Sequence, residues 1–92
     1  MHQMNQENLD PLTTFIDEGE GLYQLDVREL LLSGGEPYSS IMSCVRQLAE
    51  GEKLYLHAIF EPLPLIKKLQ RQGYHLRSEH VGPDHWVLEI GR

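Results

Sequence analysis

The stretch KLYLHAIFEP at positions 53–62 decides the fold of this 92-residue chain. Its apolar residues alternate with more polar ones, which is typical of a strand with one buried face. A Glu-Pro pair ends the stretch, and proline is favoured in the first turn of a helix because its missing N–H is not needed there. The arrangement occurs a second time, with a strand-like run over 22–27 followed by Glu36-Pro37. The chain therefore predicts two strand-then-helix units.

Apolar residues recur at helical spacing after each Glu-Pro pair, and the two stripes stop near Gly51 and Gly73. Residues 74–81 and 85–90 alternate on either side of a Gly-Pro-Asp turn and predict a hairpin. The element order is then β-α-β-α-β-β. Because helical crossovers are right-handed, we expect the first two strands to be parallel and both helices to cover one face. The predicted fold is an α/β (α+β) two-layer sandwich with a four-stranded mixed sheet, whose other face is open to water.

Charge is distributed unevenly along the chain. Residues 1–20 contain five acidic and no basic residues, so they carry −5 of the formal net charge of −6. The remaining nine acidic and eight basic residues leave 21–92 at −1. We expect 1–20 to be a flexible acidic leader and 21–92 to be a single domain. Neither part offers the extended basic surface that nucleic-acid binding requires, and no apolar run is long enough to span a bilayer, so we expect neither nucleic acid nor a membrane as a partner.

The single cysteine, Cys44, excludes an intramolecular disulfide and fits a reducing, cytoplasmic location. It falls inside the first predicted helix, beside the apolar stripe. We therefore expect it to be a small packing residue rather than a nucleophile.

Four short motifs in order carry a family resemblance: LDVREL at 25–30, GGEP at 34–37, GE at 51–52 and FEPLPL at 60–65. Together they resemble the bacterial domain-of-unknown-function family 2249, which is related to the TusA and SirA sulfur carriers. The resemblance covers about residues 22–91. It implies the same two-layer fold, which is also that of the C-terminal domain of translation initiation factor three. It further implies the strand order 1-2-4-3, with the last strand inserted in the sheet.

The sequence departs from the TusA pattern at one position that matters for chemistry. TusA-type carriers have a Cys-Pro-Glu-Pro-like sequence at the start of the first helix, where the thiolate carries a persulfide. Here Gly34 and Gly35 stand in place of the cysteine and proline. Because the carrier cysteine is absent, we expect a non-catalytic module without a cofactor, which binds a protein partner or a small polar ligand. The resemblance associates related domains with redox and nitrogen-oxide metabolism and so implies an accessory role there. The alternative is a divergent sulfur-relay protein that uses Cys44 or a partner's thiol.

The candidate ligand site is the sheet edge where both parallel strands end and both helices begin. Its candidate residues are Asp26, Arg28, Gly34, Gly35, Glu36 and Glu61. The carboxylates could hold a ligand with a positive part or a metal ion. In the alternative interpretation, the two glutamates only complement the helix dipoles and Arg28 bridges them.

The histidines and the predicted surfaces offer two further possibilities. His80 and His85 flank the hairpin turn and could form a cross-strand pair, but their spacing matches no structural zinc site, so we expect surface histidines and no metal. On the open sheet face, the candidate partner surface is formed by Tyr55, His57, Ile59 and Val87. Such a surface would allow a monomer or a weak homodimer.

The second predicted helix has a basic outer face, formed by Lys67, Lys68 and Arg71. This face could receive an acidic partner or the acidic leader of another copy. The sequence contains neither a glycine-rich nucleotide motif nor a recognisable hydrolase nucleophile. We therefore lean towards a binding function without enzymatic activity.

Overall fold

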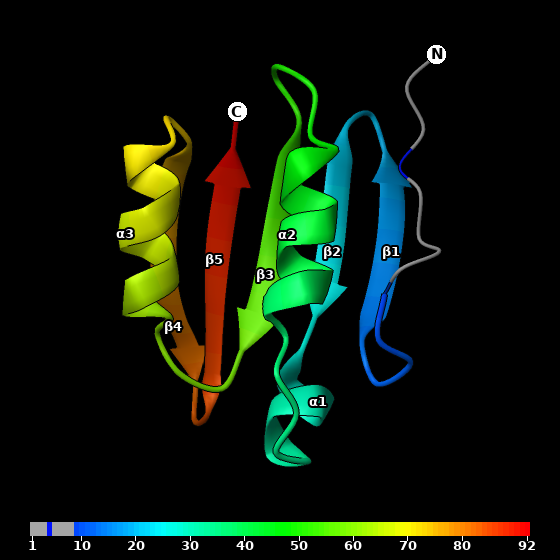
Figure 1. Ribbon diagram of the computed structural model, residues 1–92, viewed down its shortest axis with the longest axis vertical. Coiled ribbons are helices and arrows are strands. Elements are labelled where there is room, and N and C mark those ends of the chain that lie inside the picture. The colour runs from blue at the N-terminus through cyan, green and yellow to red at the C-terminus, as the bar shows by residue number, and fades with distance from the viewer. Residues whose placement is uncertain (1–3, 5–8) are drawn as a thin grey trace.

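The computed structural model describes Met4 and residues 9–92 of the chain (Figure 1). This described part contains five strands and three helices. In chain order they are β1 (Thr14–Gly19), β2 (Leu22–Asp26), α1 (Arg28–Leu32), α2 (Tyr38–Arg46), β3 (Lys53–Ala58), α3 (Leu63–Arg71), β4 (His75–Gly82) and β5 (His85–Gly91). Of the helices in the described part, none has the length and apolar character needed to cross a membrane.

The strands form one mixed sheet in the order β1-β2-β3-β5-β4. As expected from the helical crossover, β2 and β3 are parallel, and the other neighbouring pairs are antiparallel. The last strand lies between β3 and β4, so the four predicted strands take the expected order. The helices α2 and α3 lie over the same face of the sheet (Figure 1). The mixed α+β architecture of the prediction is therefore confirmed.

The predicted number of strands is wrong, because residues 14–19 of the expected leader form a fifth strand. This strand, β1, pairs antiparallel with β2. The turn between them has positive φ at all three residues 19–21, with values of 82, 58 and 77°. Two of these residues are glycines, which adopt such a backbone without steric cost. The Phe15 ring also stacks on the buried Tyr23 ring, with centroids 5.9 Å apart, and this contact attaches β1 to the domain.

The short helix α1 was not expected either. Where β2 ends, Oδ1 of Asp26 accepts the backbone N–H of Arg28 at 3.0 Å, and the chain turns directly into α1. The loop after α1 then returns against the buried Leu30, whose carbonyl accepts the Gly35 N–H at 2.9 Å. A Cβ atom on Gly35 would lie only 2.2 Å from Leu30 Cδ1. Glycine is required at this position because the loop approaches α1 so closely.

The core lies between the sheet and the two longer helices. Alternate residues of β2, β3 and β5 are fully buried, in agreement with the predicted strand period. The largest of these side chains are Leu25, Leu54, Leu56, Leu88 and Ile90. From the helices, Val45 and Leu69 complete the layer.

Candidate functional site

At one edge of the sheet, the carboxyl ends of β2 and β3 meet the N-terminal ends of α2 and α3 (Figure 1). The two strands end in register, with Asp26 opposite His57. The backbone N–H of Val27 then donates to the His57 carbonyl at 3.0 Å, which continues the pairing up to the start of α1. Three connections therefore come together at this edge: β2 to α1, α1 to α2, and β3 to α3.

Asp26 and Arg28 form an ion pair at the end of β2. Nη2 of Arg28 donates to Asp26 Oδ2 at 2.7 Å, and Nε lies 3.1 and 3.2 Å from the two carboxylate oxygens. Burial on its own would raise the pKa of Asp26, but the hydrogen bonds and charge of Arg28 outweigh it and hold this pKa below its ordinary value. Because the two side chains are 30% and 37% exposed, the pair contributes only modestly to stability.

The two predicted glutamates stand before α2 and α3. Oε1 of Glu36 accepts the backbone N–H of Tyr38 at 2.8 Å, so this carboxylate satisfies a free N–H in the first turn of α2. The backbone carbonyl of Glu61 accepts the Leu63 N–H at 2.9 Å. The guanidinium of Arg28 is engaged by Asp26, and this pair replaces the bridge to the glutamates that one interpretation of the sequence predicted.

Two cavities of about 380 Å³ each lie at this edge. The first, which we call the Asp26 recess, is lined by Leu12, Thr14, Asp26, Arg28, Glu29, Leu32, Ile59 and Asp84. The second, the helix hollow, is lined by Leu31, Gly35, Glu36, Pro37, Tyr38, Ile41, Phe60, Pro62, Pro64, Leu65 and Lys68. The six predicted ligand residues are thus divided. Asp26 and Arg28 line the recess, Gly35 and Glu36 line the hollow, and Gly34 and Glu61 are in neither lining.

The helix hollow is largely apolar, and large side chains around it are open to solvent. Of the lining residues, Phe60 is 51% exposed and Tyr38 is 38% exposed. Leu63, which follows Pro62 of the lining in the chain, is also 51% exposed. The amino group of Lys68 donates to the Tyr38 hydroxyl and lies 4.7 Å from the centre of its ring. Sequence reasoning missed the hollow because its walls come from helix starts and loops, which show no period. The signal that could have revealed it is the segment FEPLPL, which contains more apolar residues than the buried face of the second helix requires.

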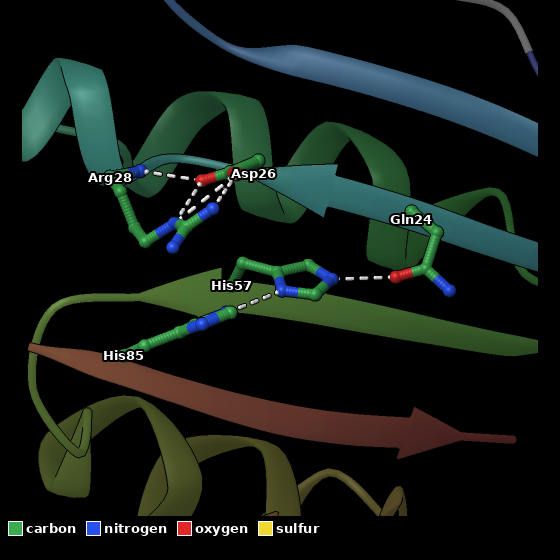
Figure 2. A network of polar contacts seen from close by, with 5 residues as sticks. All are labelled: Gln24, Asp26, Arg28, His57 and His85. Atoms are coloured by element: carbon green, nitrogen blue, oxygen red, sulfur yellow. Dashed lines mark hydrogen bonds and ion pairs between the residues drawn. The ribbon is translucent and has the colours of Figure 1, made fainter. Parts of the chain in front are cut away.

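A second group of polar side chains lies on the open sheet face (Figure 2). Oε1 of Gln24 on β2 lies 2.6 Å from Nε2 of His57 on β3. Nδ1 of the same imidazole lies 2.9 Å from Nε2 of His85, the first residue of β5. Burial lowers the pKa of His57; the nearby carboxylate of Asp26 acts in the opposite direction, and His85 and Arg28 lower the pKa further.

His80 and His85 do not form the cross-strand pair that the sequence left possible. The register of the hairpin shifts between His80 and Gly82, so that His85 lies opposite Gly82. His80 instead lies opposite Trp86, and the two rings stack with centroids 4.4 Å apart and planes 7° from parallel. His85 instead contacts His57, because β3 pairs with β5 in a register that puts His57 opposite Val87, two residues from His85.

The four residues of the predicted partner surface do not line a single depression. Tyr55 and Val87 line a shallow one of about 270 Å³ on the open face, together with Arg77, Glu79, Val81 and Glu89. Ile59 lines the Asp26 recess, and His57 belongs to the histidine contact described above. The predicted partner surface is therefore divided among the shallow depression, the Asp26 recess and the histidine contact.

Comparison with protein-family models identifies the family of the chain. A family model described as "Uncharacterized conserved protein (DUF2249)" matches residues 24–92. The chain belongs to the DUF2249 family. Comparisons with curated proteins and with solved structures find no match.

The match separates the elements of this DUF2249 chain into two groups. The strand β1 and its turn precede residue 24, so the unexpected fifth strand lies outside the matched segment. The ion pair, the helix hollow and the histidine contact have all their central residues inside it.

The matched DUF2249 segment also contains Cys44. This side chain is fully buried in the core, and burial raises the pKa of its thiol to about 12. The thiol is therefore protonated at neutral pH and has the surroundings of a packing residue.

Proposed function

We propose that this DUF2249 domain is a non-catalytic binding module whose helix hollow receives an apolar side chain from an acidic segment of a protein partner. The observation that carries the proposal is the exposure of Tyr38 and Phe60, which line one cavity, and of Leu63, which stands between its lining residues Pro62 and Pro64 in the chain. Single exposed apolar side chains need no explanation. Several of them beside an apolar cavity are typical of an interaction site.

The charge next to the hollow favours an acidic segment. Lys68 lines the hollow, and Lys67 and Arg71 are exposed on the same helix, α3. The acidic side chain in the lining, Glu36, accepts a hydrogen bond from the backbone N–H of Tyr38. A segment with its apolar anchor in the hollow and its carboxylates along α3 would match both features. Such complementary charge increases the association rate and the specificity of a complex.

Sulfur relay is less well supported than binding. A persulfide carrier needs an accessible thiolate, whereas Cys44 is buried with its pKa raised to about 12. The strand order β2-β3-β5-β4 supports the TusA-like relationship that the motifs suggested. An accessory role in redox or nitrogen-oxide metabolism, in a bacterial cytoplasm, is the part of the proposal that rests on this relationship alone.

Thiol alkylation tests the form of the sulfur-relay alternative that uses Cys44. We expect iodoacetamide to modify Cys44 in the native protein only as slowly as the core opens, and rapidly in urea. Mass spectrometry of the time course measures both rates. Fast modification of the native protein, or a persulfide formed on Cys44 from a sulfur donor, would favour sulfur relay over binding.

Short synthetic peptides test the binding proposal. One peptide carries a central leucine among glutamates, a second carries the same leucine among lysines, and a third carries serine in place of the leucine. We expect the first to bind, with shifts of the backbone NMR signals of Tyr38, Phe60 and Lys68, and with an affinity that falls as salt is added. Equal binding of the lysine peptide, or shifts confined to the open sheet face, would contradict the proposal.

Variants then identify the residues that contribute to the affinity for the peptide. We expect Phe60→Ser and Lys68→Glu each to lower the affinity for the glutamate peptide by about tenfold, as loss of an anchor contact does. The matched control is Val81→Ser, which changes an exposed apolar residue of β4 outside the hollow and should leave the affinity unchanged. Circular dichroism of each variant verifies that it is folded.

A further inference from the structure

Two imidazole nitrogens face each other on the open sheet face, away from the helix hollow. Nδ1 of His57 and Nε2 of His85 are 2.9 Å apart and come from the neighbouring strands β3 and β5 (Figure 2). We propose that these two nitrogens form a binding site for a divalent transition-metal ion such as Zn²⁺, with Gln24 holding His57 in its ligating form. This inference does not depend on the proposed peptide site.

Gln24 determines which nitrogen of His57 can bind a metal. Its Oε1 atom lies 2.6 Å from His57 Nε2, and a carbonyl oxygen only accepts hydrogen bonds. The proton of the neutral ring must therefore be on Nε2, which leaves a lone pair on Nδ1 directed towards His85. Ligating histidines in metal sites commonly donate their other N–H to a carbonyl or carboxylate in this way. Gln24 is thus a positioning residue for the site.

The spacing of the two nitrogens requires only a small adjustment. With bonds of about 2.0–2.1 Å to a tetrahedral ion, two ligating nitrogens lie about 3.3 Å apart. The rings would have to separate by a few tenths of an ångström from their present 2.9 Å. His57 is held in a strand paired on both sides, whereas His85 is the first residue of β5, next to the hairpin turn. His85 can therefore move. To bind the metal through Nε2, its neutral ring would carry its proton on Nδ1.

The surroundings supply negative charge but no complete cage. Burial disfavours a positive charge at His57, as do His85 and Arg28, whereas the carboxylates of Asp26 and Glu18 favour one. Within the described residues, no group of three histidine, cysteine or carboxylate side chains could hold a metal ion. The pair would supply two ligands and water the others. We therefore expect micromolar affinity, and coordination positions open to a further ligand.

Titration of the wild-type protein with Zn²⁺, followed by the ring ¹⁵N signals of its histidines, is the first test. We expect His57 Nδ1 and His85 Nε2 to shift together and to saturate at one ion per chain. Since this experiment uses no variant, it remains decisive if a substitution impairs folding. Shifts confined to other histidines, or binding only at millimolar metal, would overturn the proposal.

Variants give the second test, by calorimetric titration with Zn²⁺. We expect His57→Gln and His85→Gln each to weaken binding by about tenfold or more, and Gln24→Leu by about tenfold. Gln24→Leu should also give a mixture of His57 ring tautomers in the metal-free spectrum, which a purely structural role would not produce. The control is His75→Gln, an exposed histidine at the start of β4, which should bind as the wild type does. Equal affinity in all four variants would overturn the proposal.

Discussion

The helix hollow and the histidine contact lie near the same edge of the sheet, but different forces maintain them. The hollow is shaped by the backbone: Gly35 packs directly against Leu30, and prolines 37, 62 and 64 set the entry into two helices. The histidine contact is shaped by side chains, which project from regular strands and are oriented by hydrogen bonds of 2.6 and 2.9 Å. One region is therefore sensitive to steric change and the other to changes of hydrogen bonding and charge.

This difference also separates what each region can recognise. The hollow has a volume of about 380 Å³ and exposed apolar surface, which suits a side chain of a partner. The histidine contact offers lone pairs and exchangeable protons, which suits an ion. Substitutions in the two regions should therefore have distinct consequences for stability and for pH dependence.

The largest expected effect is that of Gly35→Ala. The added Cβ would lie 2.2 Å from Leu30 Cδ1 and 3.2 Å from the Leu30 carbonyl oxygen, so α1 and the loop would have to move apart. We expect a loss of about 1–3 kcal/mol in the free energy of unfolding, as for other overpacked sites, measured by urea denaturation. Gly82→Ala is the control, because its Cβ would meet open space and its φ is not positive. Equal effects at the two glycines would show that backbone packing does not shape the hollow.

A smaller effect is expected on the polar side, for Asp26→Asn. The pair with Arg28 is partly exposed, so we expect a loss of about 1 kcal/mol or less at pH 7. Because the folded-state pKa of Asp26 is lowered, its stabilising contribution is fully present above the unfolded value of about 3.9 and is lost as pH falls through the folded value.

Urea denaturation at neutral and at acidic pH checks this sign. The difference between wild type and Asp26→Asn should shrink as pH falls below about 4. Glu50→Gln, at an exposed loop carboxylate, serves as the control and should show little difference at either pH. A difference that grows in acid would mean that the pair does not stabilise the charged form of Asp26.

The strand-then-helix units could be predicted because burial leaves a direct trace in the sequence. Leu54 and Leu56 recur with the period of a strand that has one buried face, and both are buried as expected. The strand β1 left a much weaker trace. It is the outermost strand of the sheet. Of its side chains only Phe15 is packed against the core, and the neighbours of Phe15 in the strand are exposed. Its acidic composition favoured the interpretation as a leader.

The candidate site was predictable only where it depends on topology. The parallel crossover brings Asp26, the last residue of β2, and Gly35 and Glu36, which precede α2, to the same edge of the sheet. Their division between two cavities depends on α1, a helix too short to show a period. The contact between His57 and His85 depends on the register of β3 with β5, in which His57 lies opposite Val87, and no spacing of histidines in the sequence reveals this register.

The smallest effect is expected for Leu32→Gln, and it tests how far the docking surface extends. Leu32 is 75% exposed and lines the Asp26 recess rather than the helix hollow. Glutamine has a helix propensity close to that of leucine, so we expect the free energy of unfolding to change by no more than about 0.5 kcal/mol. If apolar surface matters only around the hollow, the glutamate peptide should bind this variant as it binds the wild type, in the same NMR titration. Weaker binding would instead extend the partner surface around α1 into the recess, and the two regions would then have to be treated as one site.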